Sequence, residues 1–89
     1  MSLRKISLEA EAFEGLQHWL RNDRKILQRI MDLLEEIQRD PFEGKGKPEA
    51  LKHNFRGLWS RRITGEHRLV YKVSEDEILI YSCRFHYGK

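Results

Sequence analysis

The chain has little cysteine and no long apolar segment, and both shortages exclude classes of protein. Among its 89 residues Cys83 is the one cysteine, so no internal disulfide can form and a disulfide-stabilised secreted fold is excluded. No apolar run approaches the roughly 20 residues that a membrane-spanning helix needs. The N-terminal residues also lack the apolar segment of a signal peptide. We therefore expect a cytoplasmic protein that has no membrane partner.

Metal-binding and nucleotide-binding motifs are missing as well. The four histidines are scattered, and with a single cysteine they show no metal-ligand spacing. The stretch Gly44-Lys45-Gly46-Lys47 lacks both the spacing and the strand-to-helix setting of a nucleotide-binding glycine loop. The sequence therefore predicts neither a metal site nor a cofactor.

What the chain does have is the composition of one small globular domain, spanning residues 1–89. Hydrophobic residues make up 39% and charged residues 35%, a mixture that excludes disordered and fibrous classes. A domain of this size has little reserve stability, so a dimer partner or a bound inhibitor would stabilise it measurably.

The charge of the chain is unevenly distributed. Residues 1–43 carry seven basic and nine acidic side chains, whereas residues 44–89 carry ten basic and five acidic ones. The stretch 45–72 holds eight Lys or Arg residues and only two carboxylates, Glu49 and Glu66. This asymmetry indicates an anionic partner for the second half of the chain, although a solvated basic face would have the same composition.

Two helices are predicted in the first half of the chain. After a weak strand signal at 3–7, Ser7 is expected to cap a helix that ends near Asn22. Asp23 is expected to cap a second helix, which Asp40-Pro41 stops. Apolar residues at helical spacing predict the core-facing stripes: Ala12, Phe13, Leu16, Trp19 and Leu20 in the first helix, and Ile26, Leu27, Ile30, Leu33, Leu34 and Ile37 in the second.

Beyond a glycine-rich loop at 42–48, the hydrophobic period changes to two. It predicts strands at 59–64, 68–73 and 78–87, and a further strand near 51–55. Turns are expected at Gly65-Glu66 and at 74–77. The predicted fold is α+β, with two N-terminal helices packed on a mainly antiparallel, twisted sheet of four to five strands.

Glu49 is the candidate general base. It follows a basic loop, so the cations near it in the sequence favour its ionised form. An ionised carboxylate can accept the proton of a ribose 2′-OH, whose oxygen then attacks the adjacent phosphorus. The alternative is a Glu that only pairs with its neighbours. Four cations are the candidates for binding the phosphates of an RNA: Lys45, Lys47, Lys52 and Arg62.

His86 is the candidate general acid for the leaving 5′-oxygen, because histidine titrates near neutral pH. His53 and His67 are alternative acids, and a purely surface role is also open. Phe85 and Tyr87 flank His86, so an aromatic ring could stack on a base, or Phe85 could belong to the core.

Arg68 and Arg62 are the candidates for stabilising the charge of a phosphorane-like transition state, a role worth ~3 kcal/mol where such donors have been removed. A two-residue loop at Gly65-Glu66 would pair Ile63 with Arg68 and place the two arginines on opposite faces. A three-residue loop would pair Arg62 with Arg68 on one face. The sequence is compatible with both registers.

Much of the second half resembles the YoeB toxins of the Txe/YoeB family, over residues 41–87 and almost without gaps. The first forty residues resemble the family more weakly. The matching segments are Pro41-Phe42-Glu43-Gly44-Lys45-Gly46-Lys47-Pro48-Glu49, Leu51-Lys52-His53-Asn54, Trp59-Ser60-Arg61-Arg62-Ile63-Thr64, Glu66-His67-Arg68-Leu69-Val70-Tyr71 and Cys83-Arg84-Phe85-His86-Tyr87.

The resemblance implies a RelE-like fold, also described as microbial RNase-like, and a ribosome-dependent mRNA interferase. Such a toxin is an endonuclease that cleaves mRNA in the ribosomal A site, inhibits translation and needs no metal ion. The resemblance also implies a homodimer, a YefM-type antitoxin, and contact with operator DNA only through the toxin–antitoxin complex.

Carried over residue by residue, the resemblance implies a base, an acid and a transition-state stabiliser: Glu49, His86 and Arg68. Three further residues would support them around the phosphate: Tyr87, Lys52 and Arg62. Two alternatives remain at this stage. One is a basic RNA- or ribosome-binding module without catalysis, and the other is a toxin of the same fold that acts on a protein target.

Overall fold

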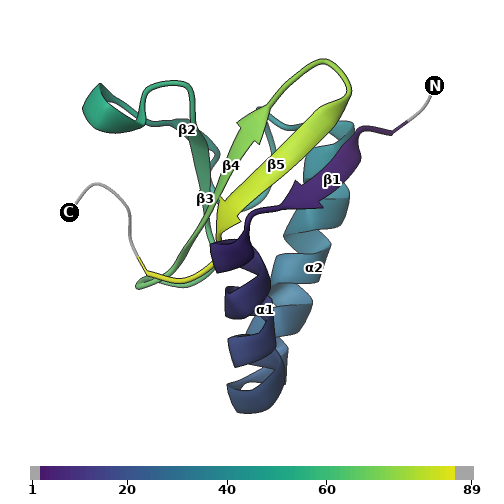
Figure 1. The fold of residues 1–89 in the computed structure, drawn as a ribbon, viewed down its shortest axis with the longest axis vertical. Helices are drawn as coiled ribbons and strands as arrows, with labels where there is room; N and C mark the ends of the chain where they lie inside the picture. The colour runs from purple at the N-terminus through teal and green to yellow at the C-terminus, as the bar shows by residue number, and fades with distance from the viewer. Residues whose placement is uncertain (1–2, 86–89) are drawn as a thin grey trace.

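A computed structural model describes residues 3–85 as a sheet covered by two helices (Figure 1). Its elements in chain order are β1 (Lys5–Leu8), α1 (Ala10–Asn22), α2 (Arg24–Arg39), β2 (Glu49–Ala50), the short 3₁₀ turn η1 (His53–Phe55), β3 (Trp59–Arg62), β4 (Arg68–Val73) and β5 (Glu77–Ser82). The strands form one five-stranded sheet in the order β1-β5-β4-β3-β2. No helix in this described part is long and apolar enough to cross a membrane.

The predicted fold class is confirmed, with one refinement of the sheet. Strand β1 runs parallel to β5, whereas the other three neighbouring pairs are antiparallel, so the sheet is mixed. Both described helices lie on the same side of it (Figure 1). The opposite face of β2, β3 and β4 is therefore not covered by these helices.

Two predicted strands differ from the observed ones. The strand expected at 51–55 is absent, because His53 has a left-handed backbone (φ 58°) and begins the turn η1. The short strand β2 lies just before it. The last strand was expected to reach residue 87, but β5 ends at Ser82 and Phe85 is also left-handed (φ 65°). A left-handed residue cannot continue an extended strand.

The helix boundaries follow the predicted signals with one exception. Helix α1 ends at Asn22, and the Asp23 carboxylate caps α2 by accepting hydrogen bonds from the backbone N–H groups of Lys25 (3.1 Å) and Ile26 (3.3 Å). Ser7, however, does not cap α1. It lies within β1, where its hydroxyl donates to Glu77 (2.6 Å), because pairing with β5 extends the strand through residue 8.

The core lies between the helices and the sheet. The predicted stripe of α2 is confirmed, with four of its residues buried and Ile26 and Leu27 packed at the edge. The predicted stripe of α1 is wrong at two positions, since Phe13 and Leu20 are 54% and 46% exposed. The rest of this stripe is confirmed, because Ala12 and Trp19 are buried and Leu16 packs against the core; Gly15 is the third buried residue of α1.

Gly15 lies where α1 approaches Cys83, the residue that follows β5. A Cβ at this position would lie 2.5 Å from the Cys83 sulfur. Alanine would gain about 1 kcal/mol of helix stability over glycine, but overpacking a core costs about 1–3 kcal/mol. We expect Gly15→Ala to lower the free energy of unfolding by about 1 kcal/mol in urea denaturation.

The Cys83→Ala background provides the control for this prediction. It removes the sulfur that the new methyl group would meet, so there Gly15→Ala should stabilise the protein by up to about 1 kcal/mol. An equal effect in both backgrounds would contradict the steric explanation.

Candidate active site

The open face of the sheet carries a pocket of about 350 Å³ at β2, β3 and β4. Three cations and one carboxylate line it, so its charge favours an anionic ligand. The lining residues are Lys47, Pro48, Glu49, Leu51, Ser60, Arg62 and Arg68.

The strand register brings the two arginines together. Arg62 is paired directly with Arg68 across β3 and β4. The backbone N–H of Ile63 donates to the His67 carbonyl (2.9 Å), which leaves a three-residue loop between them. The structure therefore selects the register in which both arginines lie on one face. On the other side of β3, Glu49 is paired with Ser60 and so lies on this same face.

Arg68 is held at the turn by its own hydrogen bonds. One guanidinium nitrogen, Nη1, donates to the carbonyls of Thr64 (2.8 Å), Gly65 (3.3 Å) and His67 (3.1 Å). Burial and the like charge of Arg62 lower the pKa of Arg68, while Glu49 acts in the opposite direction. An arginine stays protonated at neutral pH regardless. Burial is the larger cause of the lowered pKa, and the smaller effect of Arg62 reflects repulsion between two cations, which a bound phosphate would relieve.

Two of the predicted phosphate-binding lysines lie outside the pocket. The side chain of Lys45 lines a separate hollow beside α2, with Lys25 and Arg29 among its neighbours. Lys52 is exposed at the start of η1. Lys47 is the member of the basic loop that reaches the pocket. The sequence did not single out Pro48, Leu51 or Ser60, since nothing in their side-chain chemistry marks them.

The histidines have different surroundings. His67 accepts a hydrogen bond at Nδ1 from the backbone N–H of Phe85 (2.8 Å), and its ring packs edge-on against Trp19 with centroids 4.8 Å apart. His53 is exposed and does not line the pocket. The predicted acid, His86, and its neighbour Tyr87 lie outside the described residues.

The alternative that Phe85 belongs to the core is wrong. Its side chain is 59% exposed, with the Arg84 guanidinium 4.5 Å from the centre of its ring. The backbone N–H of Arg68 donates to the Phe85 carbonyl (3.0 Å). In Figure 1 this yellow stretch runs beside the turn between β3 and β4. The residue that precedes His86 in the sequence therefore lies against the backbone of Arg68.

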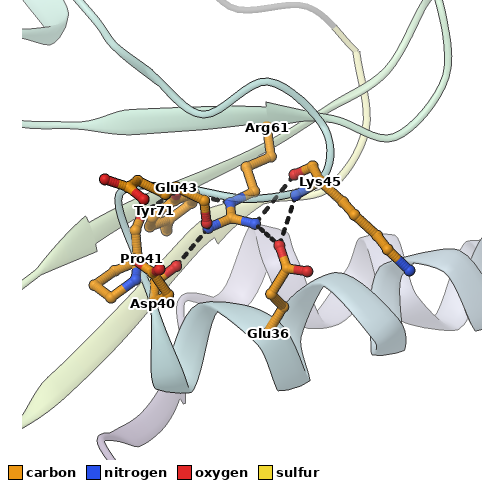
Figure 2. Close-up of polar contacts among 7 residues, drawn as sticks. All are labelled: Glu36, Asp40, Pro41, Glu43, Lys45, Arg61 and Tyr71. Carbon is orange, nitrogen blue, oxygen red and sulfur yellow. Dashed lines mark hydrogen bonds and ion pairs between the residues drawn. The ribbon is translucent and has the colours of Figure 1, made fainter.

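Arg61 is one of the eight cations counted in the stretch 45–72, and its surroundings were not predicted. Its side chain is fully buried and pairs with Glu36 on α2 (Figure 2). The signal was present in the alternation, because Arg61 shares its face of β3 with Trp59 and Ile63. Arg61 therefore contributes nothing to the exposed cationic surface.

The Glu36 side chain is 30% exposed, and its ion pair with Arg61 requires its carboxyl group to be ionised. Partial burial alone would raise its pKa, but the Lys45 backbone N–H (2.7 Å) and the Arg61 guanidinium outweigh burial and hold the pKa below its ordinary value of 4.5. A carboxyl whose pKa is lowered by folding stabilises the folded state above its unfolded pKa. That stabilisation is lost as the pH falls through the lower, folded pKa.

We therefore expect acid to weaken the wild-type protein more than the Glu36→Gln variant. Between about pH 5 and about pH 3 the urea midpoint of the wild type should fall more steeply, because the variant has no carboxyl to protonate at this position. Midpoints measured across that range for both proteins check this. Parallel curves would show that the Glu36 contact adds no pH-dependent stability.

Cys83 is a structural thiol. It is buried, its S–H donates to the Ala12 carbonyl (3.6 Å), and burial raises its pKa to about 11. A thiol with this pKa is almost wholly protonated at neutral pH and is a poor nucleophile. Within residues 3–85 no group of three or more His, Cys, Asp or Glu residues is placed to hold a metal ion.

These features define a small two-layer α+β protein, with two helices on one face of a mixed sheet and a cation-rich pocket with one carboxylate on the other. The chain belongs to the YoeB-like toxins of bacterial type II toxin–antitoxin systems, whose family model matches residues 8–87. The resemblance seen in the sequence is thereby confirmed.

Individual relatives agree over almost the whole chain. A YoeB toxin of Synechocystis is 60% identical over 85 residues, covering 96% of this chain and 99% of the relative. The structure of a YoeB dimer from Staphylococcus aureus is 45% identical with a TM-score of 0.89, covering 97% of this chain and 100% of that one. A heterotetrameric YoeB–YefM complex from the same organism is also 45% identical, with the same coverage and a TM-score of 0.86.

Proposed function

We propose that this protein is a ribosome-dependent endoribonuclease that cleaves mRNA in the A site and so inhibits translation. Family membership supports the proposal, and one structural observation carries it. Glu49 lines the same pocket as Arg62 and Arg68, so a carboxylate and two guanidinium groups converge on one site. Such a set can activate a 2′-OH and bind the phosphate beside it.

In this mechanism Glu49 accepts the proton of the ribose 2′-OH as the 2′-oxygen attacks phosphorus. The bond to the 5′-oxygen breaks, and His86 donates a proton to that leaving oxygen. The products are a 2′,3′-cyclic phosphate and a 5′-OH. No electron transfer or further reactant is needed, since the proton lost by the 2′-OH and the proton gained by the 5′-oxygen balance.

The remaining residues act on charge and position. Arg68 would stabilise the phosphorane-like transition state, with its guanidinium already fixed by three carbonyl oxygens of the turn. Arg62 and Lys47 would hold the phosphate from the other walls of the pocket. Outside the pocket, Lys45 and Lys52 would bind flanking phosphates, and Tyr87 would support the acid.

The partners follow from the relatives. The Staphylococcus aureus structures are a YoeB dimer and a YoeB–YefM heterotetramer. For this chain we propose a homodimer, a YefM-type antitoxin, and operator DNA bound only through the toxin–antitoxin complex. We place the active toxin in the cytoplasm, where it would meet ribosomes and mRNA.

Mapping mRNA 5′ ends after brief expression in bacterial cells tests the proposed function. We expect new ends in frame with codons, and these ends should require phosphorylation before an adapter can be ligated, because cleavage leaves a 5′-OH. Downstream fragments with 5′-phosphates would contradict the mechanism. Growth arrest without any new ends would favour a toxin that acts on a protein target.

A further inference from the structure

The buried Arg61 organises the loop between α2 and β2 (Figure 2). Its guanidinium pairs with the Glu36 carboxylate at one end. It also donates to three backbone carbonyls of the loop, those of Asp40 (2.6 Å), Glu43 (2.8 Å) and Lys45 (3.0 Å). One side chain therefore fixes the start and the middle of the loop, which runs from residue 40 to 48.

Tyr71 completes the cluster from β4. Its hydroxyl accepts a hydrogen bond from Arg61 Nε (3.2 Å) and donates to the Pro41 carbonyl (2.7 Å). The loop is thus held from β3, β4 and α2 at once. Gly44 permits this close wrapping, because its backbone is left-handed (φ 122°) and a Cβ there would clash with the Glu36 carboxylate.

The loop leads directly into the pocket. After Lys45 the Gly46 carbonyl accepts the backbone N–H of Arg62 (2.6 Å), and the next residues, Lys47 to Glu49, line the pocket. Arg61 and Arg62 are neighbours on β3, so their side chains point to opposite faces of the sheet. One holds the loop from the core side, and the other lines the pocket that the loop enters.

We propose that Arg61 is a positioning residue that, through this loop, sets the place of Glu49 in the pocket. This inference rests on the proposed function, because it assigns Arg61 an effect on the same cleavage reaction. Arg61 does not line the pocket, so it would act through the loop alone.

A role of Arg61 in fold stability alone explains its hydrogen bonds to the loop less well than a positioning role does. Replacing a buried ion pair with well-packed apolar residues is often neutral or stabilising. An apolar side chain, however, could not bind the carbonyls of Asp40, Glu43 and Lys45. Because Glu36 neutralises the Arg61 charge, Arg61 also adds little to the field that attracts RNA.

The test is the Arg61→Lys variant. Lysine keeps the charge but lacks the planar fork that reaches several carbonyls. Misplacement of a reacting group by ~1 Å costs ~10²-fold in rate. We expect the single-turnover rate of mRNA cleavage on programmed ribosomes to fall by about 10- to 100-fold, with ribosome affinity unchanged. Arg56→Lys, at an exposed arginine outside the pocket, is the matched control and should retain the full rate.

A double-mutant cycle separates positioning from general loss of structure. If Arg61 acts through Glu49, Arg61→Lys should have little further effect in a Glu49→Gln background. Independent losses that multiply in the double variant would overturn the positioning role. We also expect Arg61→Lys to speed amide hydrogen exchange at Lys45 and Arg62 and to leave exchange in β5 unchanged. This measurement does not depend on cleavage activity.

The cycle also distinguishes the two proposals. Full activity of Glu49→Gln would overturn the proposed function itself. Full activity of Arg61→Lys beside an inactive Glu49→Gln would overturn only the positioning role. Should Arg61→Lys not fold, Glu36→Gln tests the same loop, because it removes the charge partner and keeps the shape of the side chain. It should lower the rate in the same direction, and an unchanged rate would count against the inference.

Discussion

The Glu49→Gln variant is expected to cleave mRNA about 10²–10⁴-fold more slowly than the wild-type protein, because an amide cannot accept the 2′-OH proton. Glu49 is exposed on the two-residue strand β2, so the change should leave the free energy of unfolding unaltered. Single-turnover cleavage on ribosomes carrying a defined codon in the A site measures the effect. Ribosome affinity, determined separately, should change little.

Glu66→Gln is the matched control for this prediction. It removes the other carboxylate of the cationic stretch 45–72, which is exposed in the turn and does not line the pocket. Cleavage by this variant should equal that of the wild-type protein. Equal activity of Glu49→Gln and Glu66→Gln would leave a non-catalytic RNA-binding module as the better description of the pocket.

Replacement of Arg68 by alanine is expected to lower the cleavage rate by about 10²–10³-fold, the usual cost of removing one preorganised donor to a developing oxyanion. The side chain is already fixed by the carbonyls of Thr64, Gly65 and His67, so it loses little freedom when it binds the transition state. The loss should appear in the rate at saturating ribosomes more than in affinity.

Two further variants serve as comparisons for Arg68→Ala. Lys72→Ala removes one exposed charge from the same strand, outside the pocket, and should weaken binding slightly without slowing the saturated reaction. Arg68→Lys keeps the charge but not the fork that reaches the turn carbonyls, so it should recover only part of the rate. Recovery of the full rate by lysine would show that charge alone is required at this position.

The local signals of the sequence predicted the helices well, because caps and prolines act on the chain next to them. Asp23 and Asp40-Pro41 set the ends of α1 and α2 as expected. The face that α1 buries was less predictable. Phe13 and Leu20 continue a helical stripe but are exposed, whereas the helix approaches Cys83 at Gly15, a small residue that the stripe did not include.

The charged residues of the pocket could be predicted from the sequence, but the face of the sheet on which each one lies could not. Glu49 and Arg68 were chosen as candidates from their chemistry and from the family resemblance, whereas their shared face depends on a hairpin register that differs by one residue between two acceptable turns. The burial of Arg61 was not predicted because charge suggests exposure, and only its alternation with Trp59 indicated the core side. Burial of an arginine needs several acceptors, and these come from residues distant in the sequence.

The loop that leads into the pocket and the segment 83–85 are anchored to different helices. Glu36 of α2, through Arg61, holds the loop that leads to Glu49. Trp19 of α1 donates to the Cys83 carbonyl (2.9 Å) and packs against His67, which in turn binds the backbone before His86. A substitution in α2, or a protein bound to it, would therefore disturb the loop before Glu49 first. The same change in α1 would first disturb the segment 83–85.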